Sequence, residues 1–218
     1  HEQGEAITLL DGTVTVPHRF TVPVDHAQTL AVVLPALLQA KREQKRAKLL
    51  QYGERVWGIT TGIDDERITA AVVHLPARRM TYTAHAEGPA LLNGQPIRPV
   101  EHDLDGASIL TGKPSLAPGF WRGQVPPLRR EFRSSLAWRL CLVAEGAFNA
   151  SLSTRPCWEW DIAAGSLIAA RAGCVVSDLS GEPLHFNSPR ALTRGIVLAP
   201  AGLHGQIMAA MGPDPGPA

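Results

Sequence analysis

An acidic residue at the start of a short apolar helix carries the clearest chemistry in this chain. Residues 157–165 read CWEWDIAAG, and Asp161 stands just before an alanine-rich helical stretch. An acid at that position can cap the helix, because its side-chain oxygen accepts from the first free backbone N–H groups. Beside other carboxylates it can also bind a metal, because hard cations prefer oxygen ligands. Asp161 is therefore the first candidate functional residue.

The neighbours of Asp161 add an acid and two indole rings. Glu159 either helps to recruit a cation or faces solvent. Trp158 and Trp160, together with Trp138, suggest a stacking platform. Trp138 stands in a segment of helical periodicity, which favours a place in the core or in an interface.

Composition excludes several classes of protein. With 21 Lys and Arg against 20 Asp and Glu, the chain has no global field that selects nucleic acid or an anionic membrane. The 3 cysteines lack metal-site or disulfide-framework spacing, so a reducing compartment is expected, with the cytoplasm as default. No apolar run reaches the roughly 18–20 residues that span a bilayer. HExxH, Walker A and G-x-S-x-G patterns are absent from the sequence, which disfavours zinc hydrolase, nucleotide-driven and serine hydrolase chemistry.

Apolar periodicity predicts four helices that would position these residues. They cover about 25–50, 135–146, 162–172 and 203–211, and Gly173 ends the third.

Between the helices the chain reads as β-structure and turns. Residues 56–111 are β-rich, and Asn93-Gly94 is a strong hairpin signal because both residues tolerate positive φ. We expect strands at 68–73, 80–84, 175–178 and 196–199, a hairpin or loop at 5–24 and a proline-rich loop at 114–131. The mixture predicts an α+β fold in one domain over 1–211, with halves at about 1–113 and 130–211 and a disordered tail at 212–218.

Several segments, taken together and in order, resemble the inositol monophosphatase family of metal-dependent, lithium-sensitive phosphatases. They are VPVDHA at 22–27, GPALLNGQPI at 88–97, SSLAWRLCLVAEGAFNA at 134–150, WDIAAG at 160–165 and AGC at 172–174. The resemblance implies a layered αβαβ sandwich of the inositol monophosphatase and fructose-1,6-bisphosphatase type, often dimeric.

The resemblance also implies roles for particular residues. Asp161 matches a ligand of the metal ion nearest the leaving group, and Glu54 matches a remnant of an acid pair at the metal site. Asp25 matches the aspartate that orients the attacking water, while Ser134 and Ser135 match substrate contacts. Local alternatives are helix caps for Asp161 and Asp25 and an exposed loop acid for Glu54. Serine at 134 replaces the family's glycine, which reduces backbone freedom there.

One family motif is not found. The D-P-x-D-G-T metal site is absent, and residues 53–60 (GERVWGIT) run directly from its lead-in to the following strand. Asp11-Gly12-Thr13 matches three letters but stands out of family order, so we interpret it as a turn. Two explanations remain open: a pseudoenzyme that has lost the metal loop, or a sequence that lacks a segment near Trp57–Gly58.

The sequence therefore predicts a Mg²⁺-dependent phosphomonoesterase that hydrolyses a small phosphate ester such as inositol monophosphate. The alternative is a catalytically inactive family member that serves as a binding or assembly subunit. We expect a small phosphorylated metabolite as partner, neither nucleic acid nor membrane, and the resemblance allows a homodimer. A weaker reading gives the basic run at 41–48 a nucleic-acid role, against a solvated helix end.

Overall fold

The chain forms two compact units, residues 1–50 and residues 51–218. The computed structural model describes residues 2–3, 7–8, 14–15, 18–19, 57–64 and 67–212, with side chains described for 68–212. The helix predicted over 25–50, with Asp25 and the basic run in it, lies outside the described residues, as do Glu54 and the tail from 213 on.

The first unit contains two short antiparallel pairs. β2 (Ile7–Thr8) pairs with β3 (Val14–Thr15), which confirms a hairpin within 5–24. β1 (Glu2–Gln3) pairs with β4 (His18–Arg19).

The second unit begins with an antiparallel sheet in the order β5-β6-β7-β8-β9. Its strands are β5 (Trp57–Asp64), β6 (Arg67–Leu75), β7 (Met80–His85), β8 (Leu91–Leu92) and β9 (Gln95–Pro96). A 3₁₀ turn, η1 (Pro76–Arg78), joins β6 to β7. Asn93 and Gly94 have φ values of 50° and 82°, which confirms the predicted β8–β9 hairpin.

A second five-stranded sheet has the order β11-β10-β12-β16-β14. Its strands are β10 (Ser108–Thr111), β11 (Arg129–Glu131), β12 (Ala150–Ser153), β14 (Cys174–Ser177) and β16 (Ile196–Pro200). β10 runs parallel to both β11 and β12, whereas β16 runs antiparallel to β12 and β14. The predicted loop over 114–131 contains β11 and the 3₁₀ turns η2 (Lys113–Leu116) and η3 (Pro118–Phe120).

Three helices complete the second unit: α2 (Leu136–Ala144), α3 (Glu159–Ala172) and α4 (Ala201–Ala210). Gly173 ends α3 with φ at 110°, as its lack of a Cβ predicted. α3 begins three residues earlier than the apolar periodicity indicated, because its first turn consists of polar and aromatic residues.

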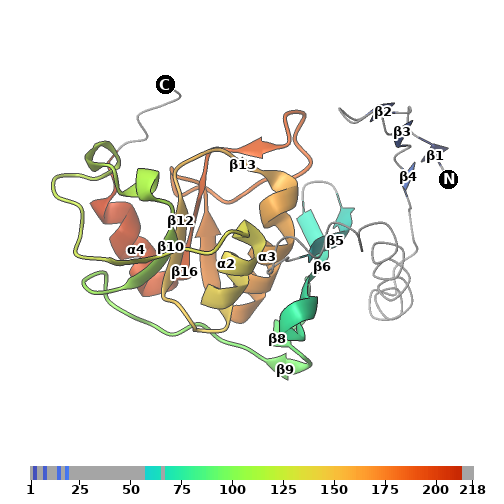
Figure 1. The fold of residues 1–218 in the computed structure, drawn as a ribbon, viewed down its shortest axis with the longest axis horizontal. Coiled ribbons are helices and arrows are strands. Elements are labelled where there is room, and N and C mark those ends of the chain that lie inside the picture. Colours follow the sequence, from blue (N-terminus) through green and yellow to red (C-terminus); the bar gives the residue numbers. More distant parts are fainter. Residues whose placement is uncertain are drawn as a thin grey trace. The chain divides into compact units, whose positions relative to one another are not determined.

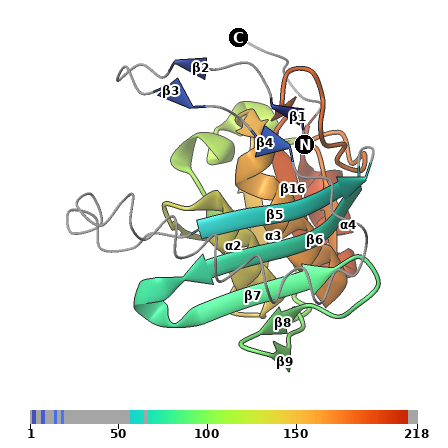
Figure 2. The same ribbon diagram turned by 90° about the vertical axis from the view of Figure 1, so that its right-hand side faces the viewer.

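The helices and sheets of this unit form alternating layers (Figure 1). Figure 2 shows β5, β6 and β7 crossing in front of α2 and α3. Behind these helices lies the second sheet, and α4 packs on its other side. The alternation along β16 shows both contacts: Ile196 and Leu198 join the core around α2 and α3, whereas Val197 and Ala199 join the core under α4. The unit is an αβαβ sandwich, which confirms the predicted fold class.

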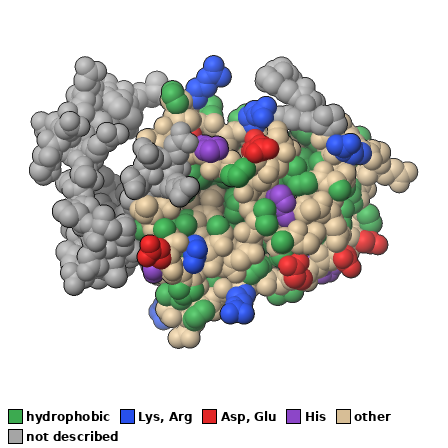
Figure 3. Space-filling view, turned by 180° about the vertical axis from the view of Figure 1, so that it is seen from behind, with side chains coloured by type: hydrophobic (Ala, Val, Ile, Leu, Met, Phe, Trp, Pro, Cys, Tyr) green, Lys and Arg blue, Asp and Glu red, His purple; other side chains and the backbone are tan. Residues whose placement is uncertain are grey.

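The surface carries charges of both signs. Figure 3 shows Lys and Arg side chains interspersed with Asp and Glu on the face opposite that of Figure 1. Within the part of the chain that the structure describes, no helix is long and apolar enough to cross a membrane.

Candidate functional site

Four strands of the second sheet end at one edge, which we call the carboxyl edge. β10, β11 and β12 are parallel, and β14 has the same direction because both β12 and β14 are antiparallel to β16. The segments that follow β11 and β12 lead into the first turns of α2 and α3. In sheets of this kind, ligands bind outside the carboxyl ends of the strands. The carboxyl edge is therefore the candidate functional site.

Asp161 lies exposed in the first turn of α3. The N-cap of this helix is Trp158, without a side-chain cap, so the interpretation of Asp161 as an N-cap was wrong. Burial of part of the carboxyl group raises its pKa above the ordinary value. Its oxygens make no hydrogen bond to a described residue, so they are available to a ligand.

Glu159 holds the start of α3 to a loop far along the chain. Its side chain is buried, and its Oε2 accepts from the backbone N–H of Asn187 at 2.6 Å. The backbone N–H of Ser188 donates to both carboxylate oxygens at 3.3 Å, and the hydroxyl of Ser188 donates to Oε1. Glu159 thus does not face solvent, so that reading was wrong, and its carboxylate is occupied by the N–H and hydroxyl groups of the 187–188 loop. Its role is to position the turn that carries Asp161.

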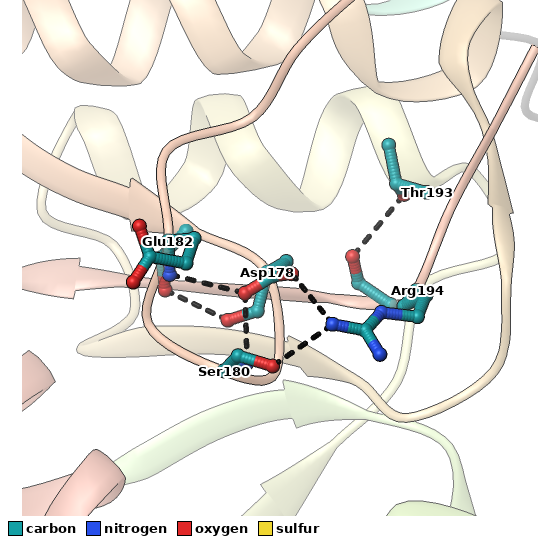
Figure 4. A network of polar contacts seen from close by, with 7 residues as sticks. Asp178, Ser180, Glu182, Thr193 and Arg194 are labelled. Atoms are coloured by element: carbon teal, nitrogen blue, oxygen red, sulfur yellow. Dashed lines mark hydrogen bonds and ion pairs between the residues drawn. The ribbon is translucent and has the colours of Figure 1, made fainter. Parts of the chain in front are cut away.

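A second polar network fixes the loop that follows β14 (Figure 4). Oδ1 of Asp178 accepts from the backbone N–H groups of Ser180 and Glu182 at 2.7 and 3.0 Å. Arg194 lies 3.7 Å from Oδ2 of Asp178 and donates to Oγ of Ser180. This loop returns through β15 (Leu192–Thr193), which pairs with β13 (Cys157–Trp158) directly before α3. The network and Glu159 therefore hold the same side of the candidate site.

Ser134 and Ser135 lie where the chain enters α2 from the carboxyl edge. Ser135 is the N-cap of α2, and its Oγ accepts from the backbone N–H of Trp138 at 3.3 Å. Ser134 is exposed. Of the residues predicted from the sequence, the structure brings Ser134, Ser135 and Asp161 to one edge, while Asp25 and Glu54 lie outside the described residues.

The three tryptophans separate into a platform and a core residue. Trp158 and Trp160 stack with ring centroids 4.5 Å apart and an angle of 11°, and are 44% and 60% exposed. Trp138 is buried, with the Arg78 guanidinium over its ring at 4.6 Å, which confirms its predicted place in the core.

The described residues do not by themselves fit a Mg²⁺ ion. Among them there is no group of three or more His, Cys, Asp or Glu side chains that could hold a metal. Asp161 would supply one oxygen ligand, and near-octahedral Mg²⁺ is usually bound by one or two carboxylates together with waters and substrate phosphates.

Comparison with known proteins identifies the class of protein to which this layered fold, with an acid in the first turn of α3, belongs. The model of the inositol monophosphatase family matches residues 58–212. The chain therefore belongs to the inositol monophosphatase family, which confirms the resemblance. The match begins after Asp25 and Glu54, so these two residues precede the region assigned to the family.

Individual relatives extend this result. The chain is 31% identical over 157 residues to the probable inositol 1-monophosphatase ImpA of Mycobacterium tuberculosis, covering 66% of this chain and 55% of that protein. It is 33% identical over 126 residues to the Nus factor SuhB of Escherichia coli, covering 53% of this chain and 46% of that one. The chain thus spans about half the length of these relatives.

A solved structure and an enzyme of another kind are also similar. Inositol monophosphatase-II of Staphylococcus aureus shares the fold, with a TM-score of 0.61 at 21% identity over 75% of this chain and 62% of that one. A segment of 86 residues, 39% of this chain, is 52% identical to the NADPH-dependent aldehyde reductase YqhD of Escherichia coli, of which it covers 19%. That share is too small a part of the reductase to carry its activity over to this chain.

Proposed function

We propose that this chain contributes the carboxyl-terminal part of the active site of a Mg²⁺-dependent phosphomonoesterase. Its substrate would be a small phosphate ester such as inositol monophosphate. The observation that carries the proposal is the position of Asp161, which is exposed at the carboxyl edge and whose carboxylate bonds to no described residue. Glu159 and the Asp178 network both hold the segment against which this turn is fixed, as expected for a carboxylate whose position matters.

The chemistry supplied by Mg²⁺ in such an enzyme is neutralisation of charge on the phosphate and activation of water. Of the described residues, Asp161 would hold the metal, while Ser134 and the first N–H groups of α2 would face the substrate. Asp25 and Glu54 remain proposed partners in catalysis and metal binding. A small phosphorylated metabolite as ligand, a cytoplasmic location and a homodimer remain proposals as well.

A second candidate is a catalytically inactive family member that serves as a binding or assembly subunit. Two observations favour it: the D-P-x-D-G-T motif is absent from the sequence, and no cluster of three metal-ligating side chains occurs among the described residues. One relative is itself named as a Nus factor.

Release of inorganic phosphate from a panel of small phosphate esters, with and without Mg²⁺, distinguishes the two functions. The matched variants are Asp161→Asn and Asp105→Asn, because Asp105 is an exposed acid just before the amino end of β10, at the opposite edge of the sheet. The phosphatase proposal expects Mg²⁺-dependent turnover that Asp161→Asn abolishes and Asp105→Asn retains. Absence of turnover in the unsubstituted chain would favour the binding subunit.

A further inference from the structure

Arg139 is a buried arginine at the carboxyl edge, and no described residue supplies a balancing anion. It stands in the second turn of α2 and is 8% exposed. Its Nε donates to the carbonyl of Arg133, and its guanidinium lies 4.4 Å over the ring of Phe132. Among the described residues, no carboxylate lies within ion-pair distance of it. Burial lowers the pKa of its guanidinium, although an arginine remains charged at neutral pH.

The packing of α2 does not require this charge. Taking an unpaired charge out of water is unfavourable, and a Met or Leu would fill the same space without that penalty. The Nη nitrogens of Arg139 bond to no described group. Among the described residues, the fully buried side-chain N and O atoms without a partner are Trp138 Nε1 and Ser166 Oγ, and the Nη atoms of Arg139 do not belong to this group. The end of the guanidinium is therefore still open to solvent.

The open end of Arg139 lies near the start of α2. Helical side chains lean toward the helix N-terminus, and the bond to the Arg133 carbonyl shows that Arg139 points back past the first turn of α2. β11 leads into α2, which carries Arg139, and β12 leads through β13 into α3, which carries Asp161. Both helices therefore begin at the carboxyl edge.

The first turn of α2 adds donors of its own. Oγ of Ser135 accepts from the backbone N–H of Trp138, whereas the N–H groups of Leu136 and Ala137 donate to no acceptor among the described residues. A helix N-terminus with free N–H groups favours anions, and a guanidinium binds phosphate oxygens through parallel N–H groups.

We propose that Arg139 binds a phosphate-type dianion at the carboxyl edge, together with the first turn of α2. This inference deepens the proposed function, because it assigns to Arg139 the recognition of a phosphate group on the substrate. A metal at Asp161 is not needed for this contact. The phosphate would provide the anion that the described residues do not supply to the buried guanidinium.

Calorimetric titration of the full chain with inorganic phosphate tests the assignment. The titration is carried out in EDTA and low chloride, so its result does not depend on Mg²⁺ or on turnover. The variants are Arg139→Gln, Arg139→Lys and Arg171→Gln. Arg171 is an exposed arginine in the last turn of α3, twelve residues from the start of that helix and so about 18 Å away.

The expected result is saturable phosphate binding by the unsubstituted chain and by Arg171→Gln. Binding should weaken by roughly tenfold or more in Arg139→Gln, the effect of losing about 1.4 kcal/mol or more. Arg139→Lys should be intermediate, because lysine keeps the charge without the fork of donors. Phosphate should raise the unfolding temperature of the unsubstituted chain and not that of Arg139→Gln.

Two results would overturn the assignment. One is phosphate binding by a folded Arg139→Gln with the affinity of the unsubstituted chain, which would leave Arg139 a structural residue of the 132–135 loop. The other is absence of phosphate binding by the unsubstituted chain. If Arg139→Gln does not fold, Arg139→Lys decides, since unchanged phosphate affinity in that variant contradicts the forked contact. Phosphate binding without any phosphatase activity would refute the proposed function alone.

Discussion

Gly165 sits where α3 crosses α2, and its replacement by alanine measures how closely these helices pack. A Cβ at this position would lie 2.9 Å from Cβ and Cδ1 of Leu140 and 3.0 Å from the carbonyl oxygen of Ala137. The first two atoms belong to a buried core residue and the third to the α2 backbone, so relief requires a movement of the helix. The close approach of α2 and α3 therefore explains the glycine that the family motif has at this position.

The size of the effect follows from two opposing terms. Alanine in place of glycine inside a helix is worth about 1 kcal/mol in favour of folding. Overpacking of a filled core costs about 1–3 kcal/mol. Gly205 in α4 provides a matched control, because a Cβ there meets nothing within 4 Å and the residue is exposed. The propensity gain is common to both variants, so Gly165→Ala should be less stable than Gly205→Ala by about 1–3 kcal/mol.

Urea denaturation followed by circular dichroism measures this difference directly. A thermal scan should show Gly205→Ala above the unsubstituted chain and Gly165→Ala below Gly205→Ala by roughly 2–12 °C, at about 2–4 °C per kcal/mol. Equal stability of the two variants would refute the reasoning, because the helices would then have room for a methyl group at their crossing.

Three further predictions concern two acidic side chains, Glu159 and Glu145, and one glycine, Gly195. Glu159→Ala should lower the free energy of unfolding by about 2–3 kcal/mol, because the N–H groups of Asn187 and Ser188 lose their charged acceptor. Glu159→Gln should lower the free energy of unfolding by less. Equal protection of these two amides from hydrogen exchange in both variants and the unsubstituted chain would contradict the prediction. Burial raises the pKa of Glu145, whose Oε2 accepts from the Tyr82 hydroxyl at 2.9 Å. Since the pKa of Glu145 is higher in the folded state, the free energy of unfolding should fall as pH rises from the unfolded-state pKa through the folded-state pKa. Denaturation at a series of pH values should show this fall in the unsubstituted chain and not in Glu145→Gln. The same pH dependence in both proteins would refute this prediction. Gly195→Ala should be strongly destabilised in the same denaturation assay, because its φ is 79° and a Cβ would lie 2.4 Å from the carbonyl oxygen of Ser153; unchanged stability would show that β16 can shift.

Much of the fold could be predicted because its signals are local. The apolar spacing of α2, the Gly173 end of α3 and the Asn93-Gly94 turn each depend on residues close in the chain. β11 gave no such signal, since it is a short edge strand of exposed charged residues without apolar alternation.

The candidate site could be predicted only in part. Asp161 stands out because its neighbours form a motif, and its helix could be read directly. The role of Glu159 could not be read, because its partners lie 28 and 29 residues further along the chain. Arg139 was missed for a similar reason: in the sequence it is one charged residue in an apolar helix, and only the packing around α2 shows that it is buried.

A calorimetric titration with Mg²⁺ tests the central claim most directly, that the carboxyl edge is a metal-assisted phosphate site built around Asp161. We expect the unsubstituted chain and Asp105→Asn to bind Mg²⁺, and Asp161→Asn to lose this binding while remaining folded. Because burial raises the pKa of Asp161, its neutral replacement should not reduce stability at neutral pH. Mg²⁺ binding that is unchanged in Asp161→Asn, or absent from the unsubstituted chain, would contradict the account.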